Sequence, residues 1–200
     1  MQDVTKRRGI RDEVASHRDP DPLFVNRWSP RVMTSEPLDE AEYLPLFEAA
    51  RWARPRSTTS TGASSTPRAR TRKWDDFVDL LNEAKQAWAT DVAVLAVITS
   101  KTTFDHNGEP APIHSFDTGA AWKNLALEGA RCGLAVHAMA GFDYERAAEE
   151  LGVPAEFDVE AMVAIGERAP AETLPEELRE REEPSGRKPL DEVVPQGGFE

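Results

Sequence analysis

The sequence predicts an α+β domain of three layers, in which a central, mainly antiparallel sheet is flanked by helices and two copies form a dimer. Helical and strand patterns follow one another as helices, strand, long helix, strand, helix, strand. These strands are too few and too irregularly connected for a doubly wound parallel sheet. Two hundred residues with 40% hydrophobic side chains suit one domain of moderate size.

Two helical patterns come first. Residues 34–52, TSEPLDEAEYLPLFEAARW, form an amphipathic pattern for which Ser35 is the expected N-cap. Residues 74–89, WDDFVDLLNEAKQAWA, repeat the pattern and are expected to form one helix. The apolar side chains that fall on one face are Tyr43, Phe47 and Ala50 in the first pattern, and Trp74, Phe77, Leu81 and Trp88 in the second.

Three strands are expected, at residues 91–100, 134–142 and 157–167. The first, DVAVLAVITS, reads as a buried strand over Val92–Ser100 by its length and its β-branched residues. A loop rich in glycine and proline, residues 104–116, follows it.

Two helices separate these strands. Residues 117–133 should form a long helix that starts at an Asp117 N-cap and ends at Gly133. It is apolar on most sides, which indicates burial on two faces, as at a dimer interface. Residues 143–154 should form a short helix stopped by Gly152 and Pro154.

Domain boundaries follow from composition. Residues 1–22 form a polar N-terminal arm, residues 23–194 the domain, and residues 195–200 a C-terminal tail. The charged stretch that begins at residue 174 should lie on the surface or wrap a second subunit.

Composition excludes several classes of protein. The net charge of −12 argues against a nucleic-acid binder, and no apolar run approaches the roughly 20 residues of a membrane helix. The chain has a single cysteine, Cys132, which rules out an internal disulfide and favours a reducing compartment such as the cytoplasm. Cys132 is expected to be a small core residue. The four histidines show no metal-ligand spacing, so no metal site is expected.

Two basic clusters are candidates for binding a phosphate. Arg27, Ser29 and Arg31 occur in NRWSPR, and Arg187 and Lys188 in SGRKPL. Guanidinium forks and a hydroxyl suit a phosphate group. Taken alone, each cluster also fits solvated surface charge.

Together with their surroundings, these clusters resemble the FMN-dependent nitroreductase family. The resemblance runs from about Phe24 to Val194 with one gap. NRWSPR is similar to the family's Arg-x-Ser-x-Arg element, which holds the flavin phosphate and ribityl chain. Residues 117–134 resemble the core helix of the family's dimer, residues 137–154 the segment that passes the flavin ring, and GRKPLDEVV the basic element that closes on the phosphate. The segment NEAK is similar to one whose Asn and Lys approach the ring.

The resemblance implies a homodimeric, cytoplasmic enzyme that binds FMN and transfers hydride from NAD(P)H to small-molecule acceptors by a ping-pong mechanism. The acceptors would be nitroaromatics, quinones or similar compounds. Such a protein positions the flavin N5 rather than supplying an acid or base. The residues that the resemblance assigns to the cofactor are Arg27, Trp28, Ser29, Arg31, Asn82, Lys85, Met139, Ala140, Gly141, Arg187 and Lys188.

The gap in the resemblance is a basic segment, residues 54–73. It has six Lys/Arg and no Asp or Glu, whereas the other 180 residues hold 18 Lys/Arg and all 36 Asp/Glu. The family has an Asn-x-Gln-Pro-Trp-Arg-Phe type of motif at this point. When codons are chosen for residues 56–67 and the reading frame is moved by two bases, the result is Val-Asp-Asn-Glu-His-Trp-Arg-Phe-Leu-Tyr-Ala. This indicates two compensating frame errors, and a genuine flexible linker is the alternative.

As written, the segment is expected to be irregular over Arg54–Lys73 and to weaken the flavin site, because small hydroxylated residues bury little area. Two alternatives to the enzyme follow. One is a non-catalytic protein of the same fold that has lost flavin binding, and the other is a basic tether for an anionic partner.

Overall fold

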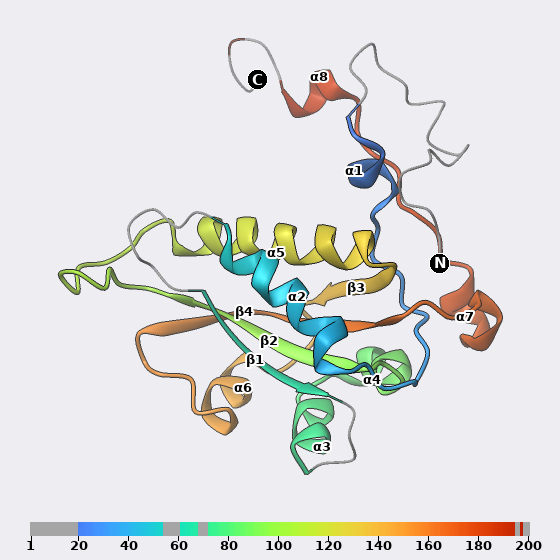
Figure 1. Cartoon of the computed structure of the whole chain (residues 1–200), viewed down its shortest axis with the longest axis horizontal. Helices are drawn as coiled ribbons and strands as arrows, with labels where there is room; N and C mark the ends of the chain where they lie inside the picture. The colour runs from blue at the N-terminus through green and yellow to red at the C-terminus, as the bar shows by residue number, and fades with distance from the viewer. Residues whose placement is uncertain (1–19, 54–60, 68–71, 195–196, 198–200) are drawn as a thin grey trace.

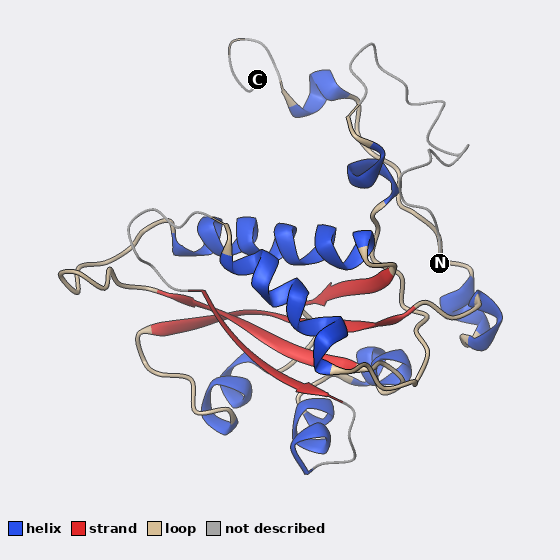
Figure 2. Ribbon diagram, in the orientation of Figure 1, coloured by secondary structure: helices blue, strands red, loops and turns tan. Residues whose placement is uncertain are grey.

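A four-stranded antiparallel sheet forms the centre of the molecule (Figure 2). The computed structural model describes residues 20–53, 61–67, 72–194 and 197. The strand order is β1-β2-β4-β3. The strands are β1 (Thr61–Pro67), β2 (Val94–Lys101), β3 (Leu134–Met139) and β4 (Phe157–Glu167).

Helices cover both faces of the sheet, as Figure 1 shows. On one face lie α2 (Glu40–Arg51) and the long α5 (His114–Arg131). On the other lie α3 (Arg72–Asp79) and α6 (Tyr144–Glu150), with α4 (Glu83–Ala89) near the end of the sheet. The predicted three-layer α+β fold is therefore confirmed.

The sheet separates two hydrophobic cores. Because side chains alternate along a strand, Leu95 and Val97 of β2 face the core that contains Trp74 and Phe77. Val94 and Ile98 face the opposite core, under α2 and α5. The interior residues of β2 and β4 are almost fully buried. This confirms the buried strand predicted at Val92–Ser100, although the strand itself begins at Val94 and ends at Lys101.

The two ends of the described chain lie together outside the layers (Figure 1). The short α1 (Pro22–Asn26) precedes the body, and η2 (Ala171–Thr173), α7 (Glu176–Arg179) and α8 (Leu190–Val193) follow it. The segments after α1 and after α7 are hydrogen-bonded to each other through the Arg31 amide and Glu182.

Two helix starts and the exposure of one residue differ from the prediction. Asp39, not Ser35, is the N-cap of α2, and its N–H donates to the Glu42 carboxylate at 2.8 Å. The long helix starts at His114 rather than after Asp117, because Ser115 Oγ donates to Glu160 on β4 and ties the extra turn to the sheet. Cys132, expected in the core, is exposed at the end of this helix.

The helix expected over residues 74–89 is divided into α3 and α4. Leu81 leaves the helix to make a β-bridge with Phe142. Asn82 then caps α4, with its Oδ1 accepting the Lys85 N–H at 3.1 Å. The predicted apolar side chains are nevertheless all buried: Trp74, Phe77, Leu81 and Trp88.

The expectation of irregular structure throughout Arg54–Lys73 is wrong. Residues 61–67 form β1, in register with β2 from Thr61 opposite Ser100 to Pro67 opposite Val94. The backbone of an edge strand can hydrogen-bond to a neighbouring strand whatever its side chains are, so a small, polar sequence still adopts the strand. The remaining parts of the prediction, at residues 54–60 and 68–71, lie outside the described residues, as does most of the N-terminal arm.

Candidate functional site

Three cations from distant parts of the chain gather beside α1. Arg27 follows α1, Lys123 lies in the middle of α5, and Arg187 precedes α8. Arg27 Nη1 donates to Ser29 Oγ at 3.3 Å. Burial and the neighbouring Arg187 lower the pKa of Arg27, and burial together with Arg27 and Arg187 lowers the pKa of Lys123. We call these three side chains the cation cluster.

The cation cluster lacks counter-charge within the described part of the chain. No carboxylate there forms an ion pair with Arg27, Lys123 or Arg187. Arg27 Nε is buried, and no described group accepts its hydrogen bond. Like charges that repel one another and a buried donor without an acceptor both favour an anion at this position.

A second group of predicted residues meets at the start of α4. The Asn82 N–H donates to the Gly141 carbonyl at 3.0 Å. A Cβ atom on Gly141 would lie 2.8 Å from Asn82 Nδ2 and 2.9 Å from Lys85 Cε, so a larger residue here would have to displace these two side chains. Burial, Arg31 and Arg181 lower the pKa of Lys85, which places this ammonium beside two further cations.

His137 on β3 supports the loop that carries the arginines. It is 9% exposed, its Nδ1 lies 2.9 Å from the Pro30 carbonyl oxygen, and its ring centroid lies 4.8 Å from that of Trp88. Burial is the main cause that lowers the pKa of His137 to about 4. The charges of Arg31 and Lys85 lower the pKa further, whereas the hydrogen bond to Pro30 raises it. A carbonyl can only accept, so Nδ1 carries the proton and donates it to Pro30.

Other predicted residues lie apart from these groups. Trp28 stacks against Arg168, whose Cζ is 4.9 Å from the indole centroid. Met139 is buried in the core beneath α3 and α4, while Ala140 is exposed. Lys188 is exposed and lies 3.8 Å from Glu192 on α8.

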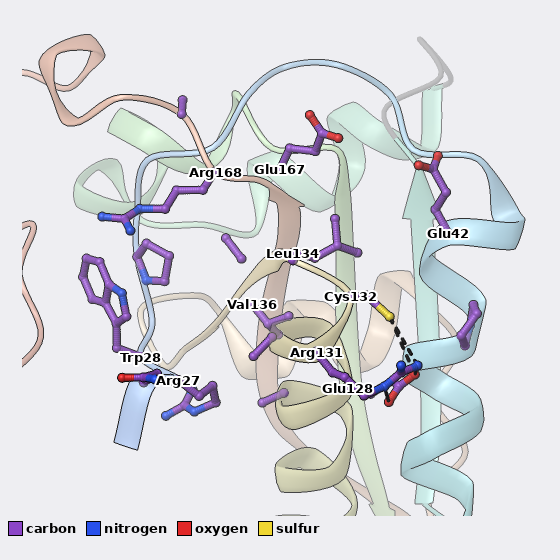
Figure 3. Close-up of a pocket in the computed structure, with 18 of the residues that line it drawn as sticks. Arg27, Trp28, Glu42, Glu128, Arg131, Cys132, Leu134, Val136, Glu167 and Arg168 are labelled. Carbon is purple, nitrogen blue, oxygen red and sulfur yellow. Dashed lines mark hydrogen bonds and ion pairs between the residues drawn. The ribbon is translucent and has the colours of Figure 1, made fainter. Parts of the chain in front are cut away.

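A cavity of about 770 Å³ opens between α2, the end of α5 and the residues around Arg27. Figure 3 shows Trp28 and Arg168 on one side of it, and Arg131, Glu128 and Cys132 on the other. Of the predicted site residues, Arg27 and Trp28 line this cavity. The cavity and the cation cluster therefore meet at Arg27.

Sequence reasoning missed two contributors. Lys123 gave a weak signal, as one of the few charged residues in a helix that is apolar on most sides, with Glu128 and Arg131. Glu182, which pairs with Arg31 at 3.6 Å, lies in a run of acidic residues and gave no signal at all.

The described residues contain neither a membrane-spanning helix nor a metal-binding group. Their helices include none long and apolar enough to cross a membrane. Within the same residues, no three His, Cys, Asp or Glu side chains are grouped so that they could hold a metal ion.

The chain is similar to several solved structures. One, described as an oxidoreductase containing FMN, is 37% identical and superimposes with a TM-score of 0.88, covering 100% of this chain and 99% of the other. A protein from Desulfovibrio desulfuricans, solved in complex with FMN, is 19% identical with a TM-score of 0.68, over 89% of this chain and 96% of its own. At that identity the likeness concerns the fold.

Sequence comparisons agree with this likeness. An uncharacterised 15.4 kDa protein of Mycolicibacterium smegmatis is 40% identical over 79 residues, which are 39% of this chain. The match spans about half (53%) of that protein's length. The nitroreductase family profile matches residues 60–167, more than half of the chain. With this match and the full-length likeness to the FMN-containing oxidoreductase, the chain belongs to the nitroreductase family.

Proposed function

We propose that this chain is an FMN-dependent NAD(P)H oxidoreductase that acts as a cytoplasmic homodimer. It would reduce nitroaromatics, quinones or similar acceptors by ping-pong hydride transfer. Two observations carry the proposal. Arg27, which is bonded to Ser29, lies near enough to Arg187, some 160 residues later, for their charges to repel, and the described residues offer no acceptor to the buried Arg27 Nε. A phosphate supplies that acceptor and the missing negative charge.

The residues present fit the cofactor at both ends. Arg27, Ser29, Arg187 and Lys123 would hold the phosphate. At the other end, the side chains of Asn82 and Lys85 pack closely against Gly141 and would face the ring. When bound, FMN supplies the two-electron chemistry that amino-acid side chains lack.

The side chains of this protein bind and orient. Lys85 carries a positive charge that favours electron density on a neighbouring ring, and its lowered pKa reflects partial burial among Arg31 and Arg181. His137, neutral at physiological pH, holds the Pro30 carbonyl and so fixes the loop from Arg27 to Arg31.

Flavin titration of Arg27→Ala tests the proposal. Losing a charge-assisted contact to phosphate should cost roughly 2–4 kcal/mol, or about 30- to 1,000-fold in FMN affinity. Affinity for riboflavin, which has no phosphate, should change little. Fluorescence quenching measures both constants.

The matched control is Arg11→Ala in the polar arm, which should leave FMN affinity almost unchanged. Equal FMN affinity with and without Arg27 would show that the phosphate assignment is wrong. A wild-type chain with neither FMN binding nor NAD(P)H-dependent reduction of a quinone would overturn the function itself.

A second candidate is a non-catalytic protein of this fold that no longer binds flavin. The composition of β1 favours it, since TGASSTP holds no apolar side chain larger than proline. Purified protein with visible flavin absorbance contradicts this candidate. Comparison with a chain whose residues 57–67 are replaced by the eleven frame-restored residues shows whether this segment prevents flavin binding.

A further inference from the structure

Glu182 is a buried carboxylate in an exposed, charged stretch. Its neighbours Glu180, Arg181 and Glu183 are exposed, whereas the Glu182 side chain is 0% exposed. A buried carboxylate is costly unless hydrogen bonds and counter-charge compensate it. Its partners therefore show what it does.

The hydrogen bonds of its carboxylate within the described residues all come from residues 27–32 near the other end of the chain, which we call the arginine loop. The Arg31 N–H donates to Oε1 at 2.9 Å and to Oε2 at 3.1 Å. The Val32 N–H donates to Oε1 at 3.1 Å. The Arg31 guanidinium lies 3.6 Å from Oε2 and donates to the Arg181 carbonyl at 3.0 Å. One carboxylate thus holds both the backbone and the side chain of Arg31.

This contact completes the support of the loop. His137 holds the Pro30 carbonyl, and the Thr34 N–H donates to the Glu167 carbonyl at 2.8 Å. Glu182 fixes Arg31 and Val32 between these two points. It is also five residues before Arg187, so the same anchor ties the segment that returns Arg187 to the cation cluster.

The carboxylate also compensates charge. Arg31 and Arg181 both act on Lys85, and Arg31 acts on His137. With Glu182 paired to Arg31, the group of Arg31, Lys85 and Arg181 carries one positive charge fewer. The charges of Arg31 and Glu182, 3.6 Å apart in a partly buried site, attract each other strongly.

We propose that Glu182 is a positioning residue of the cofactor site. Its carboxylate holds the C-terminal segment against the arginine loop, a contact that we call the latch, and offsets the charge of Arg31. This inference rests on the proposed function, because the loop and the C-terminal segment are the parts that would hold FMN. Glu182 itself touches no cofactor in this assignment. It acts through Arg31 and through the path of residues 183–187.

The test compares Glu182→Gln with Glu183→Gln, an exposed neighbour of the same chemistry, in the full chain. Glu182→Asp keeps the charge on a shorter side chain and provides a second variant if the first folds poorly. Three quantities are measured: FMN affinity by fluorescence quenching, the midpoint potential of bound FMN, and the rate at which trypsin cleaves after Arg187 in the FMN-free protein. Mass spectrometry of the released C-terminal peptide follows the cleavage.

Glu182→Gln should weaken FMN binding on the order of tenfold or more. It should shift the midpoint potential to more positive values, since the uncompensated Arg31 charge favours the anionic reduced flavin. Cleavage after Arg187 should become faster. Glu183→Gln should match the wild type in all three, and Glu182→Asp should keep the wild-type potential.

Wild-type FMN affinity and potential in Glu182→Gln would overturn the assignment. Failure of the wild type to bind FMN would instead refute the proposed function. In that case the cleavage rates after Arg187 still show whether Glu182 holds the C-terminal segment in place. Equal cleavage after Arg187 in Glu182→Gln and Glu183→Gln would show that no latch exists.

Discussion

His137 shows how a single buried side chain links the sheet to the site. Its imidazole spans from β3 to the Pro30 carbonyl and lies against the Trp88 ring at an interplanar angle of 49°. Burial makes the charged form unfavourable, so the folded protein keeps this histidine neutral down to a pKa of about 4, against 6.5 for a free side chain. The arginine loop thus depends on a neutral histidine.

The stability of the protein should therefore depend on pH through His137. Between pH 6.5 and 4 the unfolded state binds a proton that the folded state does not, so stability falls as the pH falls. A shift of this size corresponds to about 3 kcal/mol at about 1.4 kcal/mol per pKa unit. Urea unfolding from pH 7.5 to 4.5 should show a steeper loss for the wild type than for His137→Gln, which keeps a donor but does not titrate.

His106→Gln is the matched control for this experiment. His106 is exposed, with its ring centroid 5.6 Å from that of Phe104, so its replacement should change the free energy of unfolding little. Equal slopes for the wild type and His137→Gln would contradict the burial of a neutral His137.

At the scale of elements, strong periodicity made some boundaries predictable. Residues 157–167 were expected as a strand and form β4 with the same bounds. Gly133 and Gly152 were expected at helix ends, and both have the positive φ angles, 83° and 62°, that favour glycine there. These signals are local, so the sequence alone carries them.

The boundaries that were missed depend on tertiary contacts. The division between α3 and α4 follows from the bridge of Leu81 to Phe142, 61 residues away, and the early start of α5 from the bond of Ser115 to Glu160. No local sequence pattern indicates which distant residues will become such partners. The same limit applies to the site: the resemblance indicated Arg27 and Arg187, but Lys123 and Glu182 became visible only once distant segments were placed together.

The edge strand β1 is the element in which local sequence and structure disagree most. Its backbone pairs with β2 along seven residues, yet its composition favours a linker. The frame-restored sequence would place Trp-Arg-Phe-Leu-Tyr-Ala at about this position. Its aromatic residues alternate with the others, as expected for a strand with one buried face.

Replacing residues 57–67 by the eleven residues of the frame-restored sequence should stabilise the protein. Burying even one large apolar side chain contributes roughly 1.5–3 kcal/mol, so the midpoint of thermal unfolding should rise measurably. A variant with the same restored residues in scrambled order, without the alternation, is the control and should gain less. A restored chain no more stable than the present one would argue that residues 57–67 are genuine.

At the scale of the whole molecule, the helical layer of α2 and α5 exposes apolar side chains. Trp52, just after α2, is 75% exposed and Phe116 on α5 is 78% exposed. Leu44 on α2 is 46% exposed. Such side chains on a single layer are typical of a surface that meets another protein, and the proposed homodimer would bury them against a second copy.

Phe116→Glu should therefore weaken the dimer. An obligate interface of this class typically buries over about 2,000 Å² in total, and a charge placed within it at a desolvated position opposes association. Sedimentation velocity at micromolar concentration should give a dimer for the wild type and a larger monomer fraction for the variant. Tyr144→Glu is the control, because Tyr144 lies on α6, on the opposite face of the sheet, and its replacement should leave the dimer intact (Figure 1). A wild-type chain that sediments as a monomer at this concentration would show that the exposed face of α2 and α5 has another role.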